Sequence, residues 1–490
     1  MIKDLKQYMN GKWIESSNLE KIEIINPATR EVIARAPKGS REETEEAIKI
    51  AKRTFESGRW SDQSPQERAV VLLQIADILQ ENMDVLTDLE VQNNGKTKRE
   101  AQSDAEEAAN TFRYYAGLLT MPNGQAYEAS KDMQTLIVKE PMGVAGLIVP
   151  WNFPLLMSVW KIAPALAAGN SILLKPAEIT PMTAVKLFEL IDQTDLPKGA
   201  ANLVMGTGPV VGQTIAESED VDMVSFTGST GVGRQIMQAA TGNMKKVSLE
   251  LGGKSPNIIF DDADLETAID YALFGIFMGS GQVCSSGSRI LVQEEIYDTF
   301  VEKYVEKAKG IRVGPGNDER SQMGAIVSEK HFESILDYIR IGKEEGATLA
   351  LGGHRMEKDG LDKGLFIEPT VFTHVTSDMR IVREEIFGPV VTIQKFKDEE
   401  EAIKIANDSE YGLAGAVFSK DQNKAIRVIK KVRAGITWVN AYHLTTIQAP
   451  WGGYKQSGIG RSLGTYGLDE YQEIKQININ LDPKPIHWFE

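Results

Sequence analysis

The chain has 490 residues, 42% of them apolar, so it can bury a large core, and its length favours two or three domains. Lysine and arginine total 54 against 69 acidic residues, and the net charge of -15 disfavours nucleic acid and anionic membranes as partners. The charged N-terminus and the lack of a bilayer-length apolar stretch predict a cytoplasmic protein. A single cysteine, Cys284, excludes intramolecular disulfides and multi-cysteine metal sites.

Helical patterns come first along the chain. Apolar residues recur at helical spacing over 47–55. Ser64, Pro65 and Glu67 then supply an N-cap, a proline at the first helical position and a capping-box glutamate. The apolar pattern that follows runs toward Gly95, and it predicts one long helix or two.

Short apolar runs replace the helical patterns beyond about residue 138. They occupy residues 146–150, 171–175 and 223–227. Such runs are typical of buried parallel strands that alternate with helices. In open α/β sheets a ligand binds beyond the carboxyl ends of the strands, so the residues just after these runs are candidate ligand contacts. A second α/β region is expected after Pro256, and an alternating, strand-like tail at 477–480 ends the chain.

Cys284 lies in a glycine- and serine-rich segment, 279–287, directly after a helical pattern from Leu265 to Phe277. Small neighbours let a substrate approach the sulfur, and a thiolate activated by a base or by helix-terminal amides is a strong nucleophile. The alternative interpretation is a small buried apolar side chain.

Two polar residues accompany this candidate nucleophile. Glu250 ends a strand-like run just before two glycines, where a carboxylate can act as a general base or simply be a solvated strand end. Asn152 lies between Pro150 and Pro154, which restrict the backbone around it. Its amide can stabilise a developing oxyanion, or it can be an ordinary turn residue.

A glycine motif follows the third apolar run. Residues 228–233 read GSTGVG, a spacing that differs from the common dinucleotide fingerprint. Because it follows a predicted strand and precedes a helical pattern, it can still place a helix N-terminus against a diphosphate or a nicotinamide.

Six motifs in one order resemble the aldehyde dehydrogenase superfamily over essentially the whole chain. They read PWNFP at 150–154, KPAE at 175–178, FTGS at 226–229, LELGGK at 249–254, GQVC at 281–284 and EEIFGP at 384–389. The resemblance implies an α/β fold with a Rossmann-type cofactor domain (1–119 and 141–252) and an α/β catalytic domain (253–466). It also implies a small β oligomerisation element (120–140 and 467–490), and therefore a homodimer or homotetramer.

The resemblance further implies NAD-dependent oxidation of a small-molecule aldehyde to a carboxylate. Cys284 would attack the carbonyl, and Asn152 with the Cys284 backbone amide would stabilise the oxyanion. Hydride transfer to the nicotinamide would leave a thioester, which water activated by Glu250 would hydrolyse. Lys161 matches a lysine that relays protons in some relatives, with a salt bridge or a cap as the alternative role.

The same resemblance places the cofactor. Lys175 and Glu178 would bind the adenosine ribose, Ser229 would lie near the diphosphate and nicotinamide, and Glu385 would bind the nicotinamide ribose beside Phe387. Because the Glu178 carboxylate would repel a 2′-phosphate, NAD is expected over NADP. The other cofactor contacts that the resemblance implies are Pro150, Trp151, Gly208, Gly212, Gly228 and Leu251.

Around the substrate tunnel the sequence is similar to betaine aldehyde dehydrogenases, particularly in NAYH at 440–443 and QAPWGG at 448–453. A trimethylammonium group donates no hydrogen bond, so aromatic rings hold it by cation–π contact. The residues implied in the cage are Phe153, Trp160, Met278, Tyr442, His443 and Trp451. Met278 departs from the tryptophan of plant relatives, and the alternative is a tunnel for general aliphatic or aromatic aldehydes.

A monovalent cation, K⁺, is a further expected ligand, because Lys455 and Gly458 match positions associated with one in the family. Two further residues depart from the family pattern. Ser462 replaces a frequent glutamate, and Asn93 stands where some relatives carry an aspartate near the cation.

Two other classes of protein compete with this interpretation. A cysteine hydrolase would pair Cys284 with one of the five histidines, and no spacing singles one out. A structural protein built on a dehydrogenase fold would have lost the nucleophile or the base, and both are present. NADH production from an aldehyde distinguishes the three.

Overall fold

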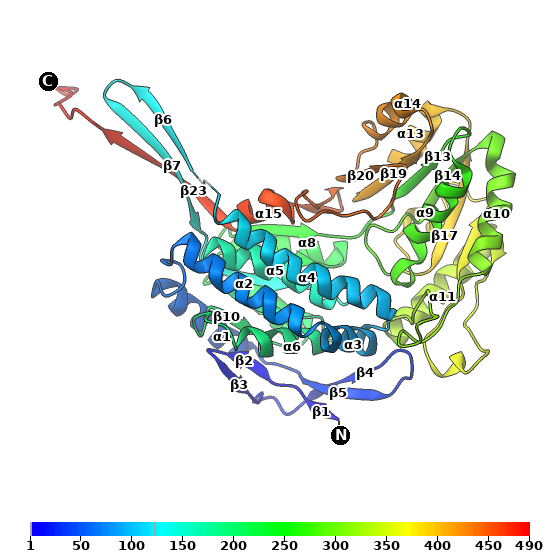
Figure 1. Ribbon diagram of the computed structural model, residues 1–490, viewed down its shortest axis with the longest axis horizontal. Helices are drawn as coiled ribbons and strands as arrows, with labels where there is room; N and C mark the ends of the chain where they lie inside the picture. The colour runs from blue at the N-terminus through cyan, green and yellow to red at the C-terminus, as the bar shows by residue number, and fades with distance from the viewer. Residues whose placement is uncertain (1, 122–123) are drawn as a thin grey trace.

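The computed structural model describes residues 2–121 and 124–490. Met1 and residues 122–123, the latter part of the expected oligomerisation element, lie outside the described residues. Figure 1 shows two lobes side by side and an arm that projects from the larger lobe and carries the C-terminus near its tip. The α/β fold class expected from the sequence is confirmed by this arrangement of mixed sheets and helices.

The larger lobe contains an eight-stranded sheet in the order β22-β12-β11-β8-β9-β10-β2-β3. Strands β12, β11, β8, β9 and β10 run parallel to one another, and β22 and β2 flank them as antiparallel neighbours. The three apolar runs predicted from the sequence are β8, β9 and β11, and every residue in these strands is buried. The strands are β2 (Gln7–Met9), β3 (Lys12–Ile14), β8 (Val144–Ile148), β9 (Ser171–Lys175), β10 (Ala201–Leu203), β11 (Met223–Thr227), β12 (Lys246–Glu250) and β22 (Gly458–Ile459).

Helices pack around this sheet, with α2, α4 and α5 overlying one another in Figure 1. The long helical pattern after Ser64 forms two helices, which meet at Asn82 (φ -110°, ψ 18°). Asn82 is the residue that ends α2, and its side chain donates to the Ile78 carbonyl at 2.8 Å. The helices are α1 (Arg41–Glu56), α2 (Pro65–Glu81), α3 (Met83–Asn94), α4 (Lys98–Leu118), α5 (Pro154–Ala168), α6 (Met182–Ile191), α7 (Gln213–Glu217) and α8 (Thr230–Ala239).

The smaller lobe contains a seven-stranded sheet in the order β15-β16-β17-β14-β13-β19-β20. Its strands are β13 (Pro256–Ile259), β14 (Arg289–Gln293), β15 (Thr348–Leu351), β16 (Thr370–Thr373), β17 (Val390–Phe396), β19 (Ala414–Phe418) and β20 (Ile436–Val439). Its helices are α9 (Leu265–Phe277), α10 (Tyr297–Lys309), α11 (Glu329–Glu344), α12 (Arg380–Arg383), α13 (Glu399–Asn407) and α14 (Gln422–Ile429). Helix α9 has the bounds predicted from the sequence, because Asp264 caps its start by accepting from the Thr267 amide.

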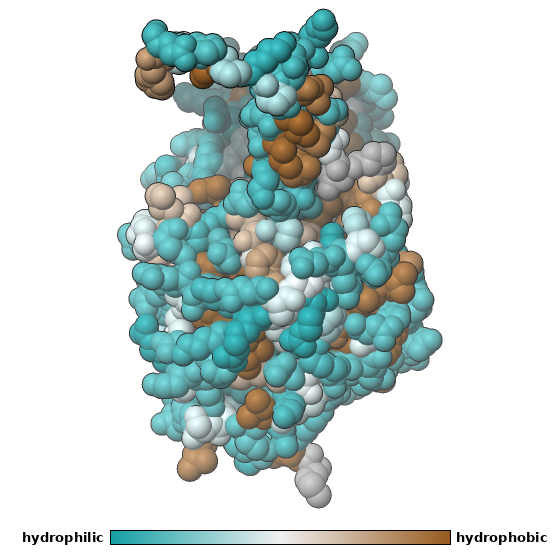
Figure 2. Space-filling view, turned by 90° about the vertical axis from the view of Figure 1, so that its left-hand side faces the viewer, coloured by the Kyte–Doolittle hydropathy of each residue, from teal (hydrophilic) through white to brown (hydrophobic). Residues whose placement is uncertain are grey.

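The arm is a three-stranded antiparallel sheet of β6 (Gln125–Ser130), β7 (Met133–Pro141) and β23 (Gln472–Asn480). The strand-like tail predicted from the sequence is therefore confirmed, and it pairs with β7 along its full length. Exposed apolar side chains on the arm include Tyr127, Ile474 and Ile477, and Figure 2 shows an apolar patch on the arm at the top of the molecule.

Smaller elements complete the fold. They are β1 (Lys3–Asp4), β4 (Lys21–Ile25), β5 (Val32–Pro37), β18 (Tyr411–Gly412), β21 (Tyr454–Lys455) and α15 (Gly464–Asp469). Within residues 2–121 and 124–490, no helix is both long and apolar enough to cross a bilayer. The assignment of the lobes and the arm to cofactor, catalytic and oligomerisation roles stays a prediction.

Candidate active site

A cavity of about 1540 Å³ opens where the two lobes meet. Three expected site residues from different elements line it together: Asn152 just before α5, Glu250 at the end of β12, and Cys284 in the loop after α9. The carboxyl ends of β8, β11 and β12 face this cavity, as expected for ligand sites of open α/β sheets.

The Cys284 thiol lies in a poorly solvated environment. Burial raises its pKa to about 12, and the carboxylates of Glu385 and Glu250 add to this rise because a second negative charge nearby is unfavourable. Backbone N–H groups of Ser285 and Cys284 act in the opposite direction. The resting thiol is therefore protonated at neutral pH, and it needs a base before it can attack a carbonyl.

Glu250 is a buried carboxyl group suited to act as a base. Burial raises its pKa, while the nearby Lys161 ammonium lowers it. Its Oε1 accepts a hydrogen bond from the Ser462 hydroxyl at 3.3 Å, and its buried Oε2 has no hydrogen-bond partner among the described residues. An unpartnered carboxylate oxygen beside the cavity can take a proton from water or from a thiol.

Lys161 lies on α5, outside the cavity wall. Its Nζ donates to the Ser225 hydroxyl at 2.9 Å, and burial lowers the pKa of the ammonium. The charge of Lys161 is near enough to lower the pKa of Glu250. Lys161 itself is not among the residues that line the cavity.

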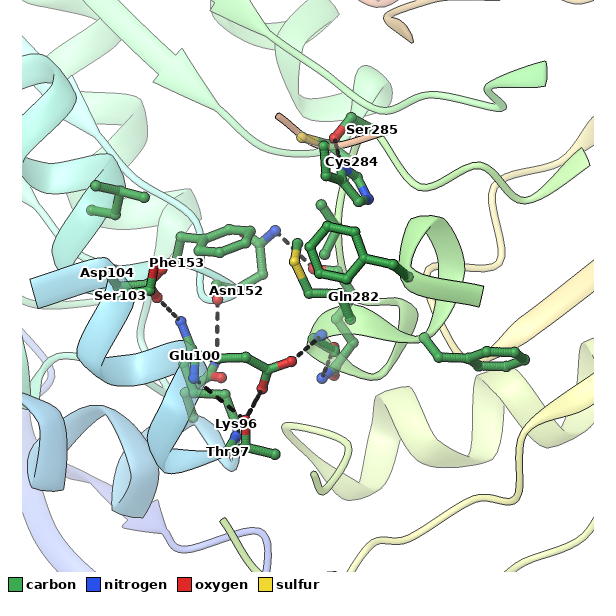
Figure 3. Close-up of a pocket in the computed structure, with 18 of the residues that line it drawn as sticks. Lys96, Thr97, Glu100, Ser103, Asp104, Asn152, Phe153, Gln282, Cys284 and Ser285 are labelled. Atoms are coloured by element: carbon green, nitrogen blue, oxygen red, sulfur yellow. Dashed lines mark hydrogen bonds and ion pairs between the residues drawn. The ribbon is translucent and has the colours of Figure 1, made fainter. Parts of the chain in front are cut away.

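Asn152 connects the start of α5 to the loop that carries Cys284. Its Nδ2 donates one hydrogen bond to the Gln282 carbonyl at 2.9 Å, and Figure 3 shows the side chain directed toward that loop. An amide nitrogen carries two hydrogens, so a second N–H remains for an oxygen atom in the cavity.

The expected nicotinamide end of the cofactor site lines the same cavity. Ser229 caps α8 by accepting from the Val232 amide, so a helix N-terminus meets the cavity. Glu385 accepts a hydrogen bond from the Gly253 N–H at 2.9 Å, and burial raises its pKa to about 7. A Cβ added at Gly252 would lie 2.0 Å from a Glu385 oxygen, so only glycine fits there. The remaining expected contacts that line the cavity are Pro150, Trp151, Gly228, Leu251 and Phe387.

The expected adenosine contacts cluster at the end of β9. The Gly208 N–H donates to the Glu178 carboxylate, and Gly212 lies close to the aliphatic part of Lys175. Burial lowers the pKa of Lys175 to about 8. These residues lie outside the wall of the main cavity. Together with the glycine-lined helix start at Ser229, they fit a dinucleotide whose adenosine end binds near β9.

The structure brings five of the six expected cage residues to the cavity: Phe153, Trp160, Met278, His443 and Trp451. The rings of Trp160 and Trp451 meet edge to face at 5.6 Å. The exception, Tyr442, is fully buried behind the site, and its hydroxyl donates to the Ser285 carbonyl at 2.8 Å. Tyr442 therefore supports the nucleophile loop from behind.

One face of Phe153 is already occupied. The Lys96 ammonium lies 4.6 Å from the centre of the Phe153 ring, and it is held in a buried cluster with Glu90 and Asp104. Because the protein's own cation uses that face, Phe153 has only its other face for a substrate cation.

Acidic residues of α4 are the main feature of the cavity that the sequence reasoning missed. Asp104 and Glu107 line the cavity one helical turn apart. Burial raises the pKa of Glu107, and the neighbouring Trp160 side chain acts in the opposite direction. Among the described residues, no hydrogen bond of normal geometry reaches its Oε1. The only available signal was the i, i+3 spacing of two carboxylates, which is common on solvated helices.

The residues expected near a K⁺ ion make hydrogen bonds to other groups of the protein. Lys455 Nζ donates to the carbonyls of Asn407 and Ser409, both at 2.9 Å. The Asn93 amide donates to the Ile179 carbonyl and accepts from the Met182 N–H. Gly458 pairs with Glu250 between β22 and β12. A bound K⁺ stays a prediction from the resemblance.

Among the described residues, no Cys–His pair supports the hydrolase alternative. Two histidines line the cavity, and their hydrogen bonds go elsewhere: His443 contacts the Ser285 hydroxyl and the Gly275 carbonyl, and His331 contacts the Phe387 carbonyl. Among the hydrogen bonds of the described residues, neither imidazole reaches the sulfur. Burial lowers the pKa of His443 to about 4, so that ring is neutral.

The family follows from comparison with known proteins. Residues 13–477 match the model of the aldehyde dehydrogenase family, and the chain belongs to that family. It is therefore an aldehyde dehydrogenase, as the six motifs predicted.

Individual relatives are similar over almost their whole length. The betaine aldehyde dehydrogenase of Bacillus subtilis (strain 168) is 48% identical over 98% of this chain and 99% of its own. An aldehyde dehydrogenase of Emericella nidulans is 46% identical over 97% and 95%. The betaine aldehyde dehydrogenase of Staphylococcus aureus, solved in complex with NAD⁺, superposes with a TM-score of 0.97 at 48% identity, covering 99% of this chain and 97% of that one.

The electrostatics of the site give a testable pH dependence. Of the nearby charges, the Glu385 carboxylate raises the Cys284 pKa the most. Replacing Glu385 by glutamine removes this charge, so alkylation of the thiol should occur at lower pH. The pKa of Glu385 is only about 7, so this carboxylate is charged wherever the thiol titrates. The rate of alkylation by iodoacetamide, measured against pH without cofactor, should show a downward shift for Glu385→Gln.

The matched control is Glu384→Gln. Glu384 is the neighbouring residue, but its carboxylate pairs with Arg380 and is not among the groups that raise the Cys284 pKa. An equal shift in both variants would show that the Glu385 charge is not the cause.

Proposed function

We propose that this protein oxidises betaine aldehyde to glycine betaine with NAD⁺ through a thioester on Cys284. The observation that carries the proposal is that Cys284, Glu250 and Asn152 line one cavity together with the Trp160–Trp451 ring pair. Betaine aldehyde dehydrogenases are among the most similar relatives, and the S. aureus enzyme binds NAD⁺.

The reaction starts at the sulfur. Glu250 takes the thiol proton directly or through water, and the Cys284 thiolate forms a C–S bond to the aldehyde carbon. The oxyanion that develops accepts hydrogen bonds from the free Asn152 N–H and from the Cys284 backbone amide. Bound NAD⁺ supplies the hydride acceptor that converts this adduct to a thioester.

Hydrolysis then uses Glu250 a second time. Its unpartnered Oε2 accepts a proton from a water molecule, and the resulting hydroxide attacks the acyl carbon and releases the sulfur. The pKa of Glu250 is raised by burial, which makes the carboxylate a stronger base than an exposed glutamate. Glu250 must lose the proton taken from the thiol before it acts on water. The proposed acceptor is Lys161 in its neutral amine form, which burial favours by lowering the pKa of the ammonium, and which is hydrogen-bonded to Ser225. The second proton, taken from water, passes from Glu250 to the released sulfur and restores the thiol.

Replacing Cys284 by serine tests the covalent step. A serine hydroxyl is a weak nucleophile without a matched base, so NADH production should fall by at least about a thousandfold. Binding of NAD⁺, measured by calorimetry, should be unchanged within about twofold. Full turnover in Cys284→Ser would exclude the thioester.

Recognition of the trimethylammonium group is proposed to combine rings with a carboxylate. The edge-to-face pair of Trp160 and Trp451 offers π-electron density to a cation. Glu107 lines the same cavity next to Trp160, and its buried Oε1 accepts no hydrogen bond of normal geometry in the described part of the chain. A cation with no N–H suits this arrangement, because it needs only compensation of its charge.

A substrate panel tests the cation preference. Betaine aldehyde should give a higher kcat/KM than hexanal or benzaldehyde. The variant Glu107→Gln keeps the size of the side chain and removes its charge, so KM for betaine aldehyde should rise about tenfold, equivalent to 1.4 kcal/mol. KM for hexanal should stay within about twofold.

Equal kcat/KM values for all three aldehydes would favour the alternative, a broad-specificity aldehyde dehydrogenase. An equal rise in KM for betaine aldehyde and hexanal in Glu107→Gln would reject a charge-based role for this carboxylate.

The arm is proposed to hold two or more subunits together. Strand β23 is exposed along most of its length, and Ile474 is 69% exposed. Apolar side chains gathered on a projecting strand are costly in water unless a second chain covers them.

Charge on the arm should therefore break the assembly. The double variant Ile474→Lys with Ile477→Lys should have a lower molar mass in size-exclusion chromatography with light scattering. Leu19→Lys, at a site 90% exposed outside the arm, is the matched control and should keep the mass of the unmodified protein. An unchanged mass in the arm variant would contradict this role.

A further inference from the structure

A carboxylate outside the expected catalytic set joins helix α4 to the loop that carries Cys284. Glu100 lies in the first turn of α4, and its Oε1 accepts a hydrogen bond from the Gly279 backbone N–H at 2.7 Å. The two residues are 179 positions apart and belong to different lobes. Figure 3 shows Glu100 between Thr97 and the loop that leads to Gln282 and Cys284.

The loop needs such restraints because its backbone is in an unfavourable conformation. Gly279, Ser280 and Gly281 have φ values of 59°, 58° and 71°, so three successive residues occupy the left-handed region. Serine carries a Cβ and adopts this region rarely, and a run of such residues is not stable by itself. Contacts from outside must therefore hold the segment 279–281 in place.

Anchors from two other segments hold the rest of the loop. The Ser280 hydroxyl donates to the Gly324 carbonyl at 3.0 Å, and the Gln282 side chain accepts from the Val327 N–H at 3.0 Å. At Gly281, an added Cβ would lie 2.1 Å from the Gly388 carbonyl oxygen, so the backbones touch. Among the hydrogen bonds of the described residues, the acceptor for the Gly279 N–H is Glu100. This bond holds the start of the loop, as the bonds of Ser280 and Gln282 hold the rest.

The second oxygen of Glu100 is also fully used. Oε2 accepts from the backbone N–H and from the hydroxyl of Thr97, both at 2.8 Å, and closes the capping box of α4. A carboxylate fixed through both oxygens has little freedom to rotate. Glu100 therefore fixes the loop that carries Cys284 relative to the start of α4.

We propose that Glu100 is a positioning residue for Cys284, which holds segment 279–281 so that the sulfur faces Asn152 and Glu250. Without this contact the loop can leave its left-handed conformation, and the sulfur and the oxyanion donors lose their alignment. The backbone amides of Cys284 and Ser285, which favour the thiolate, lose their orientation as well. Small misplacements of reacting groups cost large factors in rate.

The test compares two glutamates that share one capping geometry. Glu67 of α2 accepts from the backbone N–H and hydroxyl of Ser64, again at 2.8 Å each, but does not contact the nucleophile loop. Both Glu100→Ala and Glu67→Ala remove the glutamate of a capping box and leave the N-cap residue in place, and we expect similar small losses in Tm. Only Glu100→Ala releases Gly279.

We expect kcat for hexanal to fall at least about tenfold in Glu100→Ala and to stay within about twofold in Glu67→Ala. Hexanal is used because it carries no charge, so loss of a carboxylate from the cavity wall cannot act through substrate attraction. The pH dependence of alkylation by iodoacetamide, measured without NAD⁺, should move to higher pH in Glu100→Ala alone. Equal behaviour of the two variants in kcat and in alkylation would overturn the proposal.

Two measurements keep the proposal testable if Glu100→Ala does not fold. Thr97→Ala removes only one of the two bonds to Oε2, because the Thr97 backbone N–H still binds that oxygen and Gly279 still binds Oε1. Glu100 therefore keeps its orientation, and kcat should fall less than about threefold. In the unmodified protein, hydrogen–deuterium exchange of the Gly279 amide should be strongly slowed and should remain slow in Thr97→Ala. Fast exchange of that amide in the unmodified protein would exclude the contact.

Discussion

The chemistry of this site depends on charged groups that are held away from water. Burial raises the pKa of both the Cys284 thiol and the Glu250 carboxyl, and it lowers the pKa of the Lys161 ammonium. Both acids therefore favour their neutral, protonated forms, so the thiol needs a base before it can act as a nucleophile. The same poor solvation strengthens hydrogen bonds to a developing oxyanion, and it would strengthen the proposed attraction between a substrate cation and Glu107.

This environment exists because two lobes close over one another. The larger lobe contributes strand ends and the starts of α4, α5 and α8, and the smaller lobe contributes the loop after α9. Direct contacts join the two parts at the nucleophile: Asn152 donates to the Gln282 carbonyl, and Glu100 accepts from Gly279. The position of the Cys284 sulfur relative to Glu250 is therefore set by contacts between lobes, and local changes at either contact should affect catalysis before they affect folding.

The residues expected to bind the cofactor and those expected to bind the substrate offer different kinds of interaction within one cavity. Toward the expected nicotinamide end, Ser229 caps a helix and Gly252 leaves room for Glu385, so backbone amides and a carboxylate face a polar ligand. At the other end, Trp160 and Trp451 form an apolar, π-rich wall beside Glu107. This division agrees with a cavity that binds a dinucleotide and, as proposed, a small cationic aldehyde.

The sequence by itself determined the local elements and the chemical identity of the site. Buried strands such as β9 and the capped helix after Ser64 follow from short-range patterns, and motif order was enough to indicate Cys284, Glu250 and Asn152. Only the tertiary structure decided that Tyr442 lies behind the loop, that Lys96 covers one face of Phe153, and that Glu107 and Glu100 reach the cavity. These contacts join residues far apart in the chain, and the pKa shifts arise from burial by both lobes, so no local pattern encodes them.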